Sequence, residues 1–223
     1  MKIQDNQEDA RGIVARAIRA AGGEGTLARY GARTWKEKAV YHGADGDEQY
    51  NASYSAEWPD KFKVEIGEFT MVVHGNNGWV KTQSDTREMT QEEMDEHGEG
   101  IYSVWVMSLV PLRNNEFNVS VLGEAKIDGR PTDGVKVSRK RHFDVNMYFD
   151  RETGLLAMSE THFKEARSGK EVAQESIFSG YKDVSGINSP TKVSIKRDGR
   201  LVVEASIEMT HFERLDERVF AKP

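Results

Sequence analysis

The sequence predicts an α+β protein that consists mainly of one long antiparallel sheet. Four turn motifs, each with strand-like sequence on both sides, indicate consecutive hairpins: GNNGW (75–79), DRETGLL (150–156), GYKDVSGINSP (180–190) and RDGRL (197–201). Little helix separates these hairpins, and a long twisted sheet must curl, so we expect a hollow on one face. The apolar stretch IYSVWVMSLV (101–110) is a candidate for an element inside that hollow.

Composition limits the class of protein. The 223 residues suffice for one substantial core, and no linker, repeat or composition break divides them, so we expect a single domain over residues 1–223. A formal net charge of −6 disfavours nucleic acid as a partner. The absence of cysteine excludes disulfides, thiolate zinc sites and a cysteine nucleophile. No apolar run approaches the ~20 residues needed to span a bilayer, so we expect no membrane-spanning segment.

The first third of the chain contains one helix and then strands. An amphipathic helix is predicted over residues 8–22, ending at a glycine pair, and a short helical turn around residues 26–30. Strands are predicted over 34–42 and 48–56, on either side of a GADGD turn. Phe62, Val64 and Ile66 alternate with charged residues, which indicates one dry and one wet face. Residues 71–74 and 79–82 flank the GNNG turn, a strong hairpin signal.

A second helix is predicted in the middle of the chain. Thr90 and Glu93 fit a capping box, and acidic residues follow in the first turn. Gly98 and Gly100 are expected to interrupt this helix. The stretch 101–110 is apolar on nearly every side up to Pro111, which predicts a helix buried inside the concavity of the sheet.

Strands then continue to the end of the chain. Apolar and polar residues alternate cleanly over 117–121, 143–149 and 201–209, as expected for strands with a single apolar face. The segments 155–163 and 172–182 alternate less cleanly, so their inward faces are not assigned.

Motifs for chemistry are missing from the sequence. It contains no GxSxG, no P-loop and no dinucleotide fingerprint, and its six histidines show neither HxH nor HExxH spacing. His211 falls on the apolar face of the last strand, where we interpret it as a core or rim residue. The acidic run 92–99 is interpreted as a solvated helix face. We therefore predict no catalytic residue, no metal site and no cofactor.

One basic cluster has two interpretations. It comprises Lys136, Arg139, Lys140, Arg141 and His142. Lysine and arginine are common on solvated strand edges, where they deter edge pairing. The alternative is a contact for an anionic headgroup or an acidic partner.

Taken together, these segments resemble the LolA-like superfamily of lipoprotein and lipid carriers (LolA, LolB and LppX types), and look closest to its uncharacterised secreted members. Besides the helix that ends in a glycine pair, the resemblance rests on VVHGNNGW (72–79), LGEAKIDGRPTDGVKV (122–137), YFDRETGLL (148–156), GYKDVSGINSPTKV (180–193) and RLDERVFAKP (214–223). It covers nearly the whole chain. It implies an open antiparallel half-barrel whose concave face is covered by helices, and a lipid bound there in the bacterial cell envelope.

The resulting prediction is a non-enzymatic protein that binds a lipid or a lipoprotein acyl chain in an apolar cavity. The predicted lining residues are Phe62, Val64, Ile66, Met71, Val73, Ile101, Trp105, Leu109, Val119, Val121, Val145 and Met147. The polar start MKIQDNQED is not a signal peptide, and we expect a periplasmic or secreted location with a signal peptide removed ahead of this start. Two alternatives remain: an envelope protein-interaction or sensor module with a filled core, and a hydrolase acting on an envelope lipid.

Overall fold

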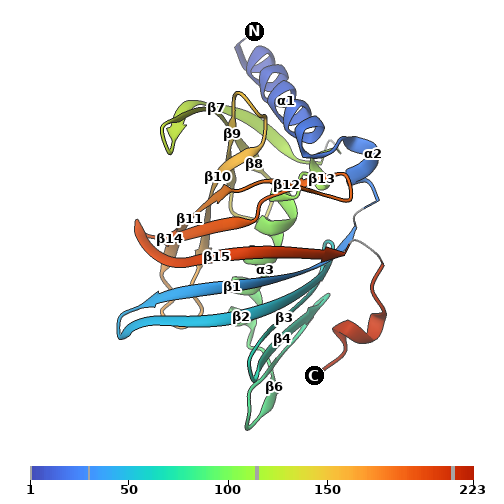
Figure 1. Cartoon of the computed structure of the whole chain (residues 1–223), viewed down its shortest axis with the longest axis vertical. Helices are drawn as coiled ribbons and strands as arrows, with labels where there is room; N and C mark the ends of the chain where they lie inside the picture. The colour runs from blue at the N-terminus through green and yellow to red at the C-terminus, as the bar shows by residue number, and fades with distance from the viewer. Residues whose placement is uncertain (1, 30, 114–115, 212–213) are drawn as a thin grey trace.

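The computed structural model describes residues 2–29, 31–113, 116–211 and 214–223. Its main feature is an open antiparallel sheet, which within these residues has thirteen strands in the order β6-β5-β4-β3-β2-β1-β15-β14-β11-β10-β9-β8-β7. The sheet twists and curls, so that β8 to β10 run steeply across the direction of β1 and β2 (Figure 1). This architecture confirms the predicted curled α+β half-barrel.

The strands divide into two groups along the chain. The first group is β1 (Ala32–Gly43), β2 (Gly46–Glu57), β3 (Lys61–Ile66), β4 (Phe69–His74), β5 (Asn77–Lys81) and β6 (Thr86–Glu88). The second group is β7 (Asn118–Ile127), β8 (Arg130–Ser138), β9 (Val145–Asp150), β10 (Leu156–Lys164), β11 (Glu171–Ser179), β14 (Lys192–Arg197) and β15 (Arg200–His211). A separate hairpin contains β12 (Lys182–Val184) and β13 (Ile187–Ser189).

The predicted turns connect the strands of the hairpins, with conformations that suit their residues. His74 pairs with Asn77, so Gly75 and Asn76 form the turn between β4 and β5. Asp198 and Gly199 both have positive φ, 47° and 78°, as a two-residue type I′ turn requires. After β9, Asp150 Oδ1 accepts hydrogen bonds from the backbone N–H groups of Glu152 and Thr153. Because these interactions are local, the turns can be predicted from the sequence motifs alone.

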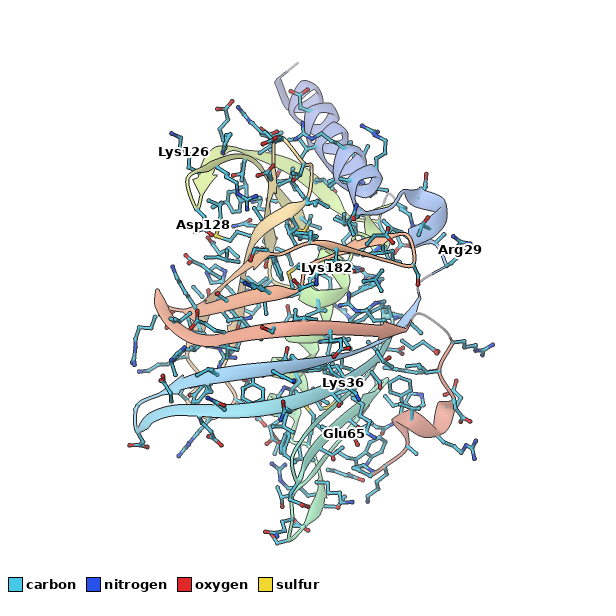
Figure 2. The ribbon with its side chains drawn as sticks, viewed as in Figure 1. Arg29, Lys36, Glu65, Lys126, Asp128 and Lys182 are labelled. Atoms are coloured by element: carbon cyan, nitrogen blue, oxygen red, sulfur yellow. The ribbon has the colours of Figure 1, made fainter. Side chains whose placement is uncertain are left out.

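Strand register gives the sheet one apolar face. Trp35 pairs with Tyr54, Tyr54 with Val64, and Val64 with Met71, which makes a continuous row across β1 to β4 on the concave side. Charged side chains occupy the other side: Figure 2 shows Lys36 of β1 among the side chains that project from the ribbon, and it is exposed. The alternation that the sequence shows therefore corresponds to a dry concave face and a wet convex face.

Two helices at the start of the chain precede the sheet. They are α1 (Lys2–Ala21) and α2 (Glu24–Leu27). The predicted helix over 8–22 thus begins six residues earlier, because residues 2–8 include no glycine or proline to stop it. Gly22 has φ 130°, and a Cβ there would collide with the carbonyl oxygen of Gly186 in the β12–β13 turn. The glycine pair therefore ends α1 and also lets it approach that hairpin.

The central helix α3 (Gln91–Met107) crosses the concave side of the sheet (Figure 1). Ile101 packs in a cluster with β1 to β4, while Tyr102 and Val106 pack in another with β7 to β9, which confirms the predicted burial in the concavity. The predicted interruption at Gly98 and Gly100 is wrong, because the helix is continuous through both. Among the described residues, no helix combines the length and apolar character needed to cross a membrane.

Two short 3₁₀ helices complete the fold. They are η1 (Pro111–Arg113), after α3, and η2 (Glu217–Phe220), at the end of the chain. η2 lies against β3 and β4, and Lys61 of β3 donates to Glu217 Oε1 at 2.7 Å. Phe220 and Val72 are both 0% exposed, so the closing segment is firmly packed.

Candidate functional site

A cavity of about 380 Å³ opens between α3 and the ends of the first hairpins. We call it the α3 pocket. One face of α3 forms its first wall: Gln91, Met94, Asp95, Gly98, Ile101, Tyr102 and Trp105. The opposite wall comes from the β2–β3 loop, from β4 and from the β4–β5 turn: Pro59, Asp60, Val73, Gly75 and Asn76. Arg139 and His142, in the loop between β8 and β9, complete the lining.

The helical residues that line the pocket recur every three or four positions (91, 94/95, 98, 101/102 and 105), so they share a face of α3. Met94, Ile101 and Trp105 contribute apolar side chains to this face, and Val73 of β4 also lines the pocket. A Cβ at Gly98 would meet no atom within 4 Å, so open space lies beside the helix there. The pocket therefore offers an apolar wall with room for a ligand.

Two methionines near the start of α3 pack closely against Gly78 of β5. A Cβ on Gly78 would lie under 3.0 Å from the sulfur atoms of both Met89 and Met94. The sulfur atoms of these two methionines occupy the space that a side chain at position 78 would need. Gly78 therefore lets the start of α3 approach the sheet closely.

The basic cluster of the sequence forms one rim of the pocket. The backbone N–H of His142 donates to the carbonyl of Arg139 at 3.2 Å, which closes a turn. The turn brings its first and fourth residues, Arg139 and His142, to the pocket, and leaves Lys140 and Arg141 exposed at its tip. Lys136, by contrast, lies on β8 and pairs with Asp144 at 3.4 Å.

Aromatic rings support the two rim residues, Arg139 and His142. The Arg139 guanidinium lies 5.6 Å from the ring centroid of Trp105 and 5.2 Å from that of Phe117. The His142 ring stacks on Tyr102, with centroids 3.8 Å apart and planes inclined by 10°. His142 Nδ1 is also 2.9 Å from Glu99 Oε1. Both residues are therefore held in place before any ligand arrives.

Tyr102 is an unsatisfied polar group in the wall of the pocket. Its side chain is 4% exposed, and its hydroxyl has no hydrogen-bond partner among the described residues. Burial, reinforced by the charge of Glu99, raises the pKa of Tyr102 to about 12, so the hydroxyl stays protonated at neutral pH. A buried hydroxyl without a partner costs free energy.

Several residues of the acidic run of α3 accept hydrogen bonds from other parts of the chain. At the start of the helix, Glu93 and Thr90 form the predicted capping box, and two hydrogen bonds from Arg87 lower the pKa of Glu93 to about 2. Farther along, Glu96 accepts from the backbone N–H of Ala166 at 2.7 Å. Glu99 accepts from the N–H of Phe143 at 3.1 Å. The interpretation of this run as a solvated face was therefore wrong for the residues that anchor α3.

At the other end of the concavity, α1 lies over β7 and β8 and fills the space. Ala10, Val14 and Ala17 of α1 are 0–2% exposed against Val135 and Phe149, which are 0% exposed. We call this region, with α1, β7 to β9 and the end of α3 after Trp105, the packed half. We call the region of β2 to β5 and α3 up to Trp105 the pocket half.

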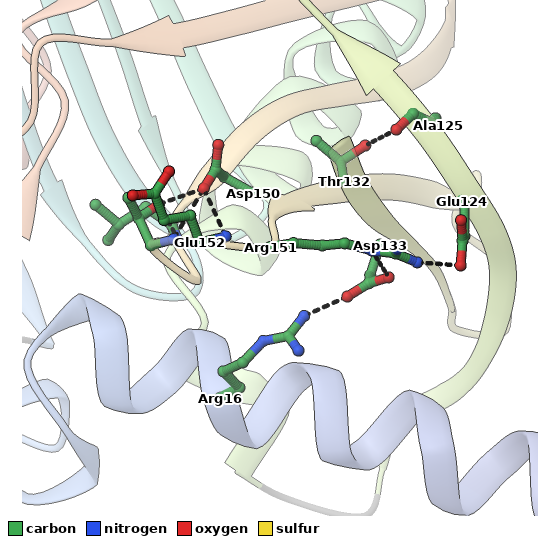
Figure 3. Close-up of polar contacts among 10 residues, drawn as sticks. Arg16, Glu124, Ala125, Thr132, Asp133, Asp150, Arg151 and Glu152 are labelled. Carbon is green, nitrogen blue, oxygen red and sulfur yellow. Dashed lines mark hydrogen bonds and ion pairs between the residues drawn. The ribbon is translucent and has the colours of Figure 1, made fainter. Parts of the chain in front are cut away.

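Ion pairs add to the apolar contacts of α1. Arg16 donates to Asp133 Oδ2 at 2.5 Å, and Arg151 donates to Asp133 Oδ1 at 2.8 Å and also pairs with Glu124 (Figure 3). Burial opposes ionisation of Asp133, but the hydrogen bonds from Arg16 and Arg151 outweigh it, so the pKa of Asp133 is lowered. This carboxylate thus fastens α1 to β8.

A second polar group lies on the concave face, on β1. Glu37 Oε1 accepts hydrogen bonds from Tyr54 at 2.5 Å and from Tyr50 at 3.4 Å. Burial raises the pKa of Glu37, although the two tyrosine hydroxyls oppose this shift. Sequence reasoning missed this group. The alternation Trp35, Glu37, Ala39 could have revealed a charged residue on the dry face.

The twelve residues that the sequence predicts as cavity lining fall into three places. Val73, Ile101 and Trp105 line the α3 pocket. Phe62, Val64, Ile66 and Met71 belong to the aromatic cluster around Trp35, next to the pocket. Leu109, Val119, Val121, Val145 and Met147 lie in the packed half, against α1 and α3. The structure therefore brings together three of them at the pocket.

The site shows no constellation for metal binding. The described residues contain no group of three or more His, Asp or Glu side chains placed to hold an ion. The side chain of His211 lies outside the part of the chain whose side chains are described.

Comparison with known proteins supports the fold. No protein-family model matches the chain, and no curated protein matches it in sequence. Solved structures do match. A domain from Vibrio parahaemolyticus described as an outer membrane lipoprotein-sorting protein has a TM-score of 0.64 at 12% identity, covering 97% of this chain and 98% of that one.

Two further structures match equally well. A LolA superfamily protein from Nitrosomonas europaea has a TM-score of 0.62 at 12% identity, covering 96% of this chain and 97% of that one. A DUF1329 family protein from Desulfovibrio piger has a TM-score of 0.63 at 12% identity, covering 95% and 97%. The predicted resemblance to LolA-like proteins is confirmed at the level of the fold.

Proposed function

We propose that this protein binds the acyl chain of a lipid or lipoprotein in the α3 pocket and catalyses no reaction on it. The observation that carries the proposal is the apolar wall of Val73, Ile101 and Trp105 beside open space at Gly98. A volume of about 380 Å³ falls in the range of about 300–1,000 Å³ typical of ligand pockets. Neighbours of the same fold that are described as lipoprotein-sorting or LolA superfamily proteins support the same class.

The driving force would be burial of apolar surface. Each buried CH₂ contributes about 0.8 kcal/mol, which tightens binding about fourfold. We therefore expect fatty-acid affinity to rise with chain length and then level off when the pocket is full. A flat dependence on chain length would contradict acyl binding.

Two glycines of α3 provide a matched test. Gly98 lines the pocket, whereas Gly100 is exposed outside it, and a Cβ at either position meets no atom within 4 Å. Gly98→Leu should abolish uptake of a fluorescent fatty acid, while Gly100→Leu should retain it. Equal uptake by both variants would place the ligand elsewhere.

The natural ligand would come from the cell envelope, so we propose a periplasmic or secreted location and a lipid or acylated lipoprotein as partner. Mass spectrometry of an organic extract of natively purified protein tests this directly. Repeated absence of lipid would favour the alternative, an envelope protein-interaction module. The solid filling of the packed half is the feature that favours that alternative.

A further inference from the structure

The α3 pocket has two different polar ends. One end, toward the start of α3, is lined by Gln91 and Asp95. The other end lies at Tyr102, seven residues after Asp95. Because a helix rises about 1.5 Å per residue, roughly 10 Å separates the two ends. Asp60 adds a second carboxylate to the lining. At the far end stand Arg139 and His142.

We propose that the rim formed by Arg139 and His142 recognises an anionic headgroup, a phosphate or a carboxylate, on the amphiphile whose chain occupies the pocket. The inference rests on the proposed function and deepens it, because it names the class of ligand and its orientation. The anion lies at the Arg139 end, where the Glu99 carboxylate is already paired with His142 and with the N–H of Phe143, whereas Asp95 at the other end would repel it.

Arg139 is well placed for this task. Its guanidinium packs against the rings of Trp105 and Phe117, and this stacking orients the group. Its ion-pair partner is Glu116, whose Oε2 is 3.7 Å away, a distance too long for a hydrogen bond. The Glu116 side chain is also 65% exposed. An anion in the pocket offers closer, bidentate contacts.

Two further features point to the same end of the pocket. The unsatisfied hydroxyl of Tyr102 belongs to the ring on which His142 stacks. The tip of the turn carries Lys140 and Arg141, both exposed. In a chain with a net charge of −6, these cations concentrate positive charge at the mouth of an apolar pocket.

Matched amphiphiles test the proposal on the intact chain. Isothermal titration below the micellar concentration would compare dodecyl phosphate, dodecyl maltoside and dodecyltrimethylammonium. We expect dodecyl phosphate to bind about tenfold or more tighter than dodecyl maltoside, and dodecyltrimethylammonium to bind weakest. Equal affinities for the three would overturn the headgroup proposal and leave the acyl pocket standing. No binding of any of them would overturn both.

Variants then assign the contact. Arg139→Gln should reduce the affinity for dodecyl phosphate about tenfold more than the affinity for dodecyl maltoside, while Arg139→Lys should retain part of the preference. Lys140→Gln removes the same charge from the same turn, outside the pocket, and should change affinity less than about twofold. If the Arg139 and Lys140 variants lost the same affinity for dodecyl phosphate, the preference would come from the overall charge of the turn, and the proposal would be overturned.

Inorganic phosphate distinguishes a lipid headgroup from a free anion. We expect 10 mM phosphate to leave dodecyl phosphate binding nearly unchanged, because the apolar wall contributes nothing to a bare ion. Phosphate that competes as strongly as the amphiphile would overturn recognition of a headgroup. Thermal unfolding of each variant checks that the fold is intact.

Discussion

The packed half and the pocket half of the concave face have the same kind of inward side chains but are closed in different ways. In the packed half, small residues of α1 such as Ala10 and Ala17 let the helix lie directly on the sheet, and the facing residues are fully buried. In the pocket half, α3 presents Gly98 and polar residues, and space remains. The helix that covers a strand therefore decides whether its apolar face becomes core or pocket.

The largest effect is expected from the packed half. Phe149 is 0% exposed in the cluster under α1. Phe149→Ala leaves a closed void and should lower the free energy of unfolding by about 3–5 kcal/mol. Urea unfolding measures this change. A loss below about 1 kcal/mol would mean that the region is not solidly filled, and the comparison would fail.

One pair of valines compares the halves with identical chemistry. Val145 is 0% exposed in the packed half, and Val73 is 4% exposed in the wall of the pocket. Val145→Ala should cost about 2 kcal/mol, because a transfer term and a cavity term add. Val73→Ala should cost about 1 kcal/mol, because it enlarges a space that is already open. Equal costs would show that the two positions are packed alike.

Features with local causes could be predicted from the sequence. The capping box needs just Thr90 and Glu93, three residues apart, and the turns need glycine or asparagine at fixed positions. Gly98 and Gly100 misled the prediction, because propensity costs about 1 kcal/mol per glycine and tertiary anchoring through Glu96 and Glu99 overrides it.

The candidate site could be predicted in part. Trp105 and Ile101 were expected at the cavity and line the pocket, and the basic cluster was noticed. The sequence could not separate Val73, which lines the pocket, from Val145, which lies under α1, because both sit in similar apolar strands. That separation depends on the position of helices distant in the chain. Tyr102 escaped notice because an unsatisfied hydroxyl is visible only once its surroundings are known.

The ion pair that fastens α1 should have a smaller effect. Arg16 and Asp133 have side chains that are 39% and 17% exposed, so a double-mutant cycle with alanine should give a coupling of about 0.5–1 kcal/mol. The folded pKa of Asp133 lies below its usual 3.8, so this stabilisation is complete above that pH and is lost as the pH falls through the folded value. Strict additivity of the two single variants would exclude the coupling.

The smallest effect concerns the other helix and distinguishes α3 from α1. Burial lowers the pKa of His97 in α3, although the charges of Glu96 and Glu93 oppose the shift. The unfolded chain therefore takes up a proton first, near pH 6.5, so stability is complete above this pH and decreases as the pH falls below it. Hydrogen exchange, corrected for the intrinsic pH dependence, should show α3 amides opening more readily at pH 5.5 than at pH 7.5, with α1 amides unchanged. His97→Gln should remove the difference, and an equal response of both helices to acid would show that the two halves do not open independently.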